Sequence, residues 1–99
     1  MQNLEVNDFK NGFKTDENPV IIDVRTPEEE AEGLIPNSIN LNIMDQNFPT
    51  KVLDLDKSKT YYVYCRSGAR SANACQFMEK NGLKSYNLIG GIQAWNSAQ

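Results

Sequence analysis

The sequence contains no histidine, and this absence excludes several kinds of catalytic site. A Ser-His-Asp triad, a Cys-His pair and a histidine-ligated metal all depend on an imidazole. The chain has only two cysteines, which are too few for a structural zinc site or for a disulfide framework. Any chemistry must therefore use cysteine, arginine, carboxylates, hydroxyls or the backbone.

The sequence also lacks a long apolar run and an excess of positive charge. No apolar stretch comes near the ~18 residues of a membrane span, and the start of the chain shows no secretory signal. The net charge of −3 makes nucleic acid and anionic membranes poor partners. We expect a cytoplasmic protein whose two cysteines stay reduced.

The chain of 99 residues is long enough for one core, and we expect a single domain over residues 1–99. Short β-branched or aromatic runs predict strands at 19–24, 38–43, 60–65 and 85–89. Spacing and capping residues predict helices at 6–14, 26–33 and 71–82, a helical connection within 45–56 that breaks before Pro49, and a closing helix within 90–99. This alternation implies an α/β fold, in which a small parallel sheet carries helices on both faces.

Capping residues mark the starts of two of these helices. Asn7 is a candidate N-cap for the first helix. Thr26 would cap the second helix, with Pro27 at its first position and Gly33 ending it.

The stretch "YYVYCRSGARSANACQF", residues 61–77, places Cys65 between a predicted strand and a predicted helix. Ligand sites of parallel sheets lie at the carboxyl ends of the strands. The amides of residues 66–70 would converge there, Gly68 would allow a positive φ, and the helix, which would begin near residues 69–71, would add its positive end. With Arg66 and Arg70 nearby, the pKa of Cys65 is expected to fall from about 8.5 to roughly 3.5–7.5.

Each of these residues also has a purely structural interpretation. Cys65 would then be a buried apolar thiol. Arg66 and Arg70 would lie in solvent or pair with the acidic segment 16–32. Cys75 lies among apolar helix positions, and we expect it to pack in the core.

Asp23, Arg25 and Glu29 lie at and beyond the end of the strand at 19–24. An Asp-x-Arg at a strand end with a nearby glutamate favours a buried hydrogen-bonded group that holds the loops, rather than a catalytic one. In the same way, residues 90–91 and Trp95 are expected to serve a turn and packing.

Two classes of enzyme place a thiolate in an anion-binding loop at a helix N-terminus. Cysteine phosphatases use a C-x5-R loop, whereas one class of sulfurtransferase uses a shorter loop. Here Cys65 and Arg70 form C-x4-R, and Ser71 holds the sixth position after the cysteine. A loop one residue short is too tight to wrap a tetrahedral phosphate, so the spacing favours sulfur chemistry.

Four motifs follow one another between Leu4 and Trp95. They are D-V-R at 23–25, T-P-E-E-E at 26–30 followed by G-L-I-P at 33–36, C-R-S-G-A-R-S at 65–71, and G-G-x-x-x-W at 90–95. In kind and in order they resemble the single-domain rhodanese-like family. Leu34 stands where that family usually has histidine, so the resemblance carries no histidine contact over to this chain.

The resemblance implies a sulfurtransferase with Cys65 as its nucleophile. Cys65 would take sulfane sulfur from a donor such as thiosulfate and pass it, from a persulfide, to a thiol or cyanide acceptor. The implied substrate-binding loop consists of Arg66, Ser67, Gly68, Ala69, Arg70 and Ser71, with the two arginines on the donor's oxyanion. The implied partners are a small anionic donor, with a protein persulfide as an alternative, and the acceptor. No metal or organic cofactor is implied.

Three other functions use the same residues. The fold could serve as a sulfur carrier or protein-interaction module with little turnover, although such a module could dispense with its cysteine. A thiol redox sensor would need Cys75 exposed and near Cys65. A cysteine phosphatase or arsenate reductase is disfavoured by the length of the loop.

Overall fold

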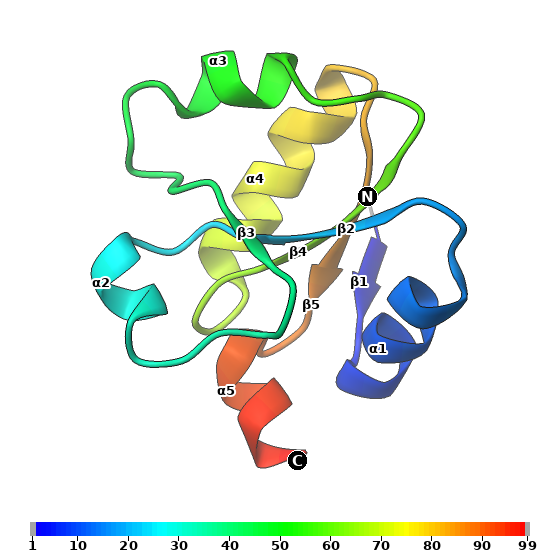
Figure 1. Ribbon diagram of the computed structural model, residues 1–99, viewed down its shortest axis with the longest axis vertical. Coiled ribbons are helices and arrows are strands. Elements are labelled where there is room, and N and C mark those ends of the chain that lie inside the picture. The colour runs from blue at the N-terminus through cyan, green and yellow to red at the C-terminus, as the bar shows by residue number, and fades with distance from the viewer. Residues whose placement is uncertain (1, 99) are drawn as a thin grey trace.

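Five parallel strands form the centre of the fold, which the computed structural model describes for residues 2–98 (Figure 1). The strands are β1 (Gln2–Leu4), β2 (Pro19–Asp23), β3 (Ile39–Asn40), β4 (Thr60–Tyr64) and β5 (Lys84–Leu88). Their order across the sheet is β1-β5-β4-β2-β3, and every neighbouring pair is parallel. The predicted α/β class is confirmed, and β4, which leads to Cys65, lies in the middle of the sheet.

Helices cover both faces of this sheet. They are α1 (Val6–Thr15), α2 (Pro27–Glu30), α3 (Phe48–Leu53), α4 (Ala69–Lys80) and α5 (Gly91–Ser97). Helices α3 and α4 contribute Phe48, Val52 and Met78 to the hydrophobic core on one face. Helices α1 and α5 contribute Phe9 and Trp95 to the core on the other face. Among residues 2–98, none of the helices is long and apolar enough to cross a bilayer.

Strand β4 is buried on both faces. Tyr61, Val63 and Cys65 belong to the core beneath α4, whereas Tyr62 and Tyr64 belong to the core beneath α1 and α5. A central strand of a parallel sheet has no solvent face, which explains why its sequence is a continuous run of strand formers. Cys65 therefore follows a strand that packing fixes from both sides.

Four predictions about the ends of elements are wrong. Helix α2 ends at Glu30, three residues before Gly33, which was predicted to end it. Strand β3 covers Ile39–Asn40 rather than 38–43, although the N–H groups of Leu41 and Ile43 still donate to the carbonyls of Asp23 and Val24 beside it. Helix α1 begins at Val6 with Glu5 as its N-cap, so Asn7 lies inside the helix. Helix α3 is not interrupted before Pro49. It holds the proline in its first turn, where a missing N–H costs no hydrogen bond.

Strand β1 was not predicted from the sequence. Its three residues pair with β5 at the edge of the sheet and are too short to show a period. Its middle residue, Asn3, nevertheless accepts a hydrogen bond from the side chain of Asn87 in β5.

Candidate active site

Cys65 begins a tight loop at the carboxyl end of β4. The loop leads to Gly68, and α4 starts at Ala69, within the predicted range. Gly68 is the N-cap of α4 with a φ of +108°, a left-handed conformation that residues with a side chain rarely adopt. This turn brings the Gly68 N–H back onto the sulfur of Cys65.

Two direct hydrogen bonds hold the Cys65 sulfur. The Gly68 N–H donates to Sγ at 3.1 Å, and the Ser71 hydroxyl donates at 3.2 Å. Burial alone would raise the pKa of Cys65, but these contacts, with the N–H groups of Ser71 and Ser67, outweigh burial and hold the pKa below its ordinary value. The direction agrees with the sequence prediction. The largest lowering contributions are the hydrogen bonds of the loop, and Arg70 also interacts electrostatically with the thiol.

The first turn of α5 supports the loop from a different element. The Ile92 N–H donates to the Cys65 carbonyl at 2.9 Å, and the Gln93 N–H donates to the Arg66 carbonyl at 3.2 Å. Gly91 permits this approach, because a Cβ at its position would lie 2.5 Å from the Cys65 carbonyl oxygen. The turn predicted at 90–91 is therefore also a backbone support for the loop.

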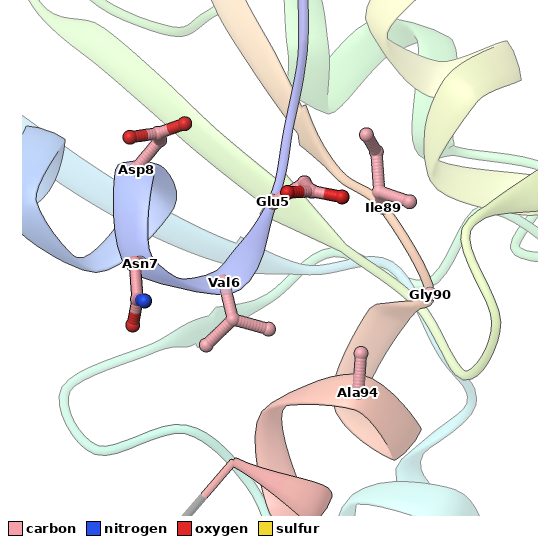
Figure 2. A pocket seen from close by; sticks show the side chains of 7 residues that line it. All are labelled: Glu5, Val6, Asn7, Asp8, Ile89, Gly90 and Ala94. Atoms are coloured by element: carbon pink, nitrogen blue, oxygen red, sulfur yellow. The ribbon is translucent and has the colours of Figure 1, made fainter.

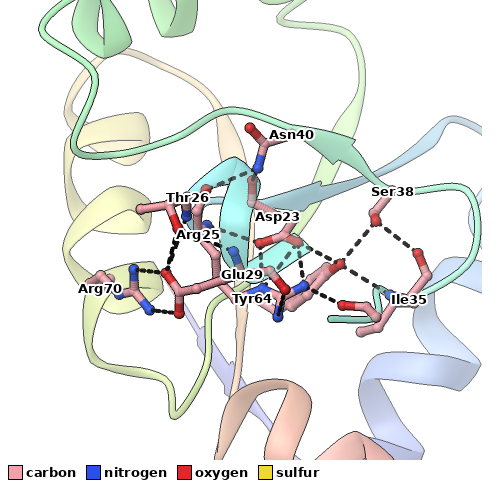
Figure 3. Close-up of polar contacts among 10 residues, drawn as sticks. Asp23, Arg25, Thr26, Glu29, Ile35, Ser38, Asn40, Tyr64 and Arg70 are labelled. Atoms are coloured by element: carbon pink, nitrogen blue, oxygen red, sulfur yellow. Dashed lines mark hydrogen bonds and ion pairs between the residues drawn. The ribbon is translucent and has the colours of Figure 1, made fainter. Parts of the chain in front are cut away.

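The guanidinium of Arg70 is bound by Glu29. Its two terminal nitrogens each lie 2.7 Å from a Glu29 carboxylate oxygen (Figure 3). Glu29 also closes a capping box with Thr26, in which each side chain accepts a hydrogen bond from the other residue's N–H. The sequence left open whether Arg70 pairs with the acidic segment 16–32, and this ion pair is such a contact. It ties α2 to the start of α4.

A buried polar network lies beside this ion pair (Figure 3). Arg25 donates to both carboxylate oxygens of Asp23, from Nε at 3.0 Å and from Nη2 at 2.8 Å. Its terminal nitrogens also donate to the carbonyls of Gly33 and Glu29. The Tyr64 hydroxyl donates to Asp23 at 3.1 Å. The predicted buried, hydrogen-bonded pair of Asp23 and Arg25 is confirmed, and its contacts reach both ends of the turn that contains α2.

Two hollows lie near the loop. One, of about 160 Å³, lies between α2 and α5 and is lined by polar side chains that include Arg66, Glu32 and Gln93. Arg66 is exposed, and within residues 2–98 its side chain has no ion pair or hydrogen bond. The other, of about 510 Å³, lies between the start of α1 and the turn at Gly90 (Figure 2). Only the smaller of these two is lined by a residue of the loop.

Comparison with known proteins decides the family. A family model described as "Rhodanese-like domain" matches residues 5–98. The chain belongs to the rhodanese-like domain family.

Known members support this assignment. YtwF of Bacillus subtilis, whose name describes it as a candidate sulfurtransferase, is 43% identical over 87 residues, which cover 88% of this chain and 82% of YtwF. The thiosulfate sulfurtransferase GlpE of Coxiella burnetii is 35% identical over 80 residues, which cover 79% of this chain and 72% of GlpE. The solved structure of a rhodanese-related protein from Thermoplasma volcanium has a TM-score of 0.87 at 34% identity, covering 99% of this chain and 93% of that one.

Two other residues that the sequence singles out, Cys75 and Leu34, do not hold the sulfur by hydrogen bonds within residues 2–98. Cys75 is fully buried in α4, and burial raises its pKa to about 11, which confirms the prediction of a packed core thiol. Leu34, at the position where rhodanese-like proteins usually have histidine, is 43% exposed in the turn after α2. Neither residue has a hydrogen bond to Cys65 among residues 2–98.

The side chain of Ser71 is the part of the site that the sequence prediction missed. The prediction placed Ser71 in the substrate-binding loop without giving its hydroxyl a role, yet this hydroxyl contacts the sulfur. The signal was its spacing. Ser71 lies in the first turn of α4, so its side chain can turn back toward the residue that precedes the helix.

The Glu29–Arg70 ion pair predicts a pH-dependent contribution to stability. The pKa of Glu29 falls from 4.5 to about 2, first because Arg70 donates hydrogen bonds to its carboxylate. A lowered pKa means that the stabilisation is complete above about pH 4.5 and is lost as the pH falls toward 2. We expect Glu29→Gln, which keeps the capping box, to lower the melting temperature at pH 7 by roughly 5 °C.

Thermal unfolding measured at several pH values tests this prediction. The difference between wild type and Glu29→Gln should narrow as the pH is lowered from 4.5 toward 2. Glu28→Gln, at an exposed neighbour with no ion pair within residues 2–98, is the matched control and should change little. A difference for Glu29→Gln that is constant with pH would rule out the ion pair as its cause.

Proposed function

We propose that this rhodanese-like chain is a sulfurtransferase that carries sulfane sulfur on Cys65. The proposal rests on the hydrogen bonds from Gly68 and Ser71 to Sγ, because they stabilise a sulfur anion without a histidine. The thiolate attacks the outer sulfur of thiosulfate, the S–S bond breaks, and sulfite leaves with the bonding electron pair. Cyanide or an acceptor thiolate then takes the outer sulfur from the persulfide and returns Cys65 to the thiolate.

The loop favours a small anionic donor. Cys65 is 1% exposed, which keeps bulky groups away from its sulfur. The named activity of the relative GlpE supports thiosulfate as that donor, with a persulfide as the alternative. We further propose that residues 1–99 act as one domain, in the cytoplasm, with a thiol or cyanide as acceptor and without a metal or organic cofactor.

The spacing C-x4-R between Cys65 and Arg70 also predicts which substrates are rejected. Wild type should form thiocyanate from thiosulfate and cyanide and should not hydrolyse an aryl phosphate at an appreciable rate. A glycine inserted between Ala69 and Arg70 should weaken sulfur transfer, because it moves the donors that converge on Sγ. Robust hydrolysis of the aryl phosphate by wild type, without transfer from thiosulfate, would overturn the proposed function.

Arg66 is the guanidinium best placed to hold the donor's oxyanion. It follows Cys65 in the chain and lines the smaller hollow, and its side chain has no partner within residues 2–98, whereas Arg70 already binds Glu29. A charge-assisted hydrogen bond contributes about 1.5–3 kcal/mol, so Arg66→Ala should raise the KM for thiosulfate roughly 10-fold or more. Arg66→Lys should recover part of the loss, since it restores the charge without the planar fork.

Steady-state kinetics with thiosulfate as the varied substrate test the role of Arg66. Gln93→Ala is the matched control, because Gln93 lines the same hollow without a charge, and its KM should stay close to that of wild type. An unchanged KM in Arg66→Ala would show that the oxyanion is held elsewhere.

A further inference from the structure

The side chain of Asn87, in β5, contacts the loop that begins at Cys65. It is 4% exposed, and its Nδ2 donates to the Gly68 carbonyl at 3.3 Å and to Oδ1 of Asn3 at 2.9 Å. Its own Oδ1 is buried and has no hydrogen bond within residues 2–98. Buried polar atoms without a partner are rare and destabilise the folded protein. The presence of Asn87 therefore needs an explanation other than a contribution to the stability of the fold.

The orientation of the Asn87 amide follows from its neighbours. The Gly68 carbonyl can only accept, so the Asn87 atom that faces it must be the NH₂ group. If the amide were turned over, Oδ1 of Asn87 would face the Gly68 carbonyl oxygen, and two acceptors cannot form a hydrogen bond with each other. The unpartnered oxygen is therefore the consequence of placing a donor on the Gly68 carbonyl.

Ser71 has one hydroxyl proton and two acceptors within reach. Its Oγ lies 3.2 Å from the Cys65 sulfur and 3.2 Å from the Gly68 carbonyl oxygen. A hydroxyl donates one hydrogen bond at a time in good geometry. The contact that lowers the energy of the thiolate therefore competes with a contact to the backbone.

The Gly68 carbonyl is already occupied by other donors. The Ala72 N–H donates to it at 3.1 Å as part of α4, and Asn87 donates at 3.3 Å. A carbonyl oxygen has two lone pairs, which these two donors satisfy. We propose that Asn87 is a positioning residue that, by occupying the Gly68 carbonyl, directs the Ser71 hydroxyl proton onto the Cys65 sulfur.

Asn87 in this role acts only through Ser71 and never contacts the sulfur itself. The inference builds on the proposed function of Cys65, but its test measures the thiolate directly and does not depend on which donor the enzyme uses. Arg70 and Cys75 both interact electrostatically with Cys65, and every variant below leaves both residues unchanged.

The test is a double-mutant cycle between positions 87 and 71. The rate of Cys65 alkylation by iodoacetamide is followed from pH 4 to pH 10 in wild type, Asn87→Ala, Ser71→Ala and the double variant. Asn87→Leu is included because it fills the same space and needs no partner, so it reports even if the alanine variant folds poorly. Ser85→Ala is the matched control, since Ser85 is a buried polar residue of the same strand that contacts Cys75 instead of the loop. Far-ultraviolet circular dichroism confirms folding.

We expect both Asn87 variants to raise the pKa of Cys65. At a pH below that pKa, the alkylation rate should fall about threefold or more, because the thiolate loses part of the energy of one charged hydrogen bond. In the Ser71→Ala background the same changes should have no further effect, and Ser85→Ala should behave as wild type. An unchanged pKa in both Asn87 variants would overturn the inference. So would an equal shift with and without Ser71, because Asn87 would then act by a route that does not involve the hydroxyl.

Discussion

Cys65→Ser is expected to abolish transfer of sulfur from thiosulfate to cyanide, with a fall in rate of roughly 10⁴-fold or more. A serine hydroxyl at this position is not ionised near neutral pH, and it cannot form a persulfide. The loop should survive, because its backbone contacts with Ile92 and Gln93 do not involve the sulfur. Thiocyanate formation at saturating thiosulfate measures the effect.

Cys75→Ser is the matched control for this prediction. Cys75 is fully buried in α4, and its sulfur has no assigned role, so the variant should keep sulfur transfer at reduced stability. If Cys75→Ser lost transfer while Cys65→Ser kept it, the assignment of the nucleophile would be wrong.

Gly91→Ala should nearly abolish transfer although residue 91 never contacts the substrate. An added Cβ would meet the carbonyl of Arg66 and would lie 2.5 Å from that of Cys65, and both are backbone atoms that cannot turn aside. Its φ of +58° adds a smaller cost for any side chain. A displacement of about 1 Å at the reacting group costs roughly 10²-fold in rate, so we expect a loss of at least that size.

Gly82→Ala separates the close contact from the backbone conformation. Gly82 also has a left-handed φ, +81°, but a Cβ there would meet only the Lys57 side chain, at 3.8 Å. This variant should lose some stability and keep its activity. Equal activity in Gly91→Ala and wild type, measured as thiocyanate formation with melting temperatures alongside, would show that α5 does not hold the loop.

The sequence was sufficient to predict the fold class and the place of the loop. The run from Thr60 to Tyr64 is buried on both faces, and such runs are characteristic of a central parallel strand. Gly68, with its positive φ, marked the turn between that strand and α4. These features are local, because they depend on residue types within a few positions of one another.

What the sequence could not predict depends on contacts between distant segments. The sequence predicted that amides and arginines surround the Cys65 sulfur, whereas in the structure the Ser71 hydroxyl also donates to it. For Arg70 the sequence offered only an acidic segment as an alternative partner. The actual partner, Glu29, depends on how α2 lies beside α4. Asn87 showed no signal at all, because its contact with Gly68 spans two elements.

The direct measurement of the central claim is the intact mass of the protein after incubation with thiosulfate. The account predicts that the mass rises by one sulfur atom, that the added sulfur is on the peptide containing Cys65, and that cyanide or a thiol removes it. Cys65→Ser should gain no mass under the same conditions. If wild type gained no sulfur from thiosulfate or from a persulfide donor, or gained it on Cys75, the proposed sulfur transfer through Cys65 would be contradicted.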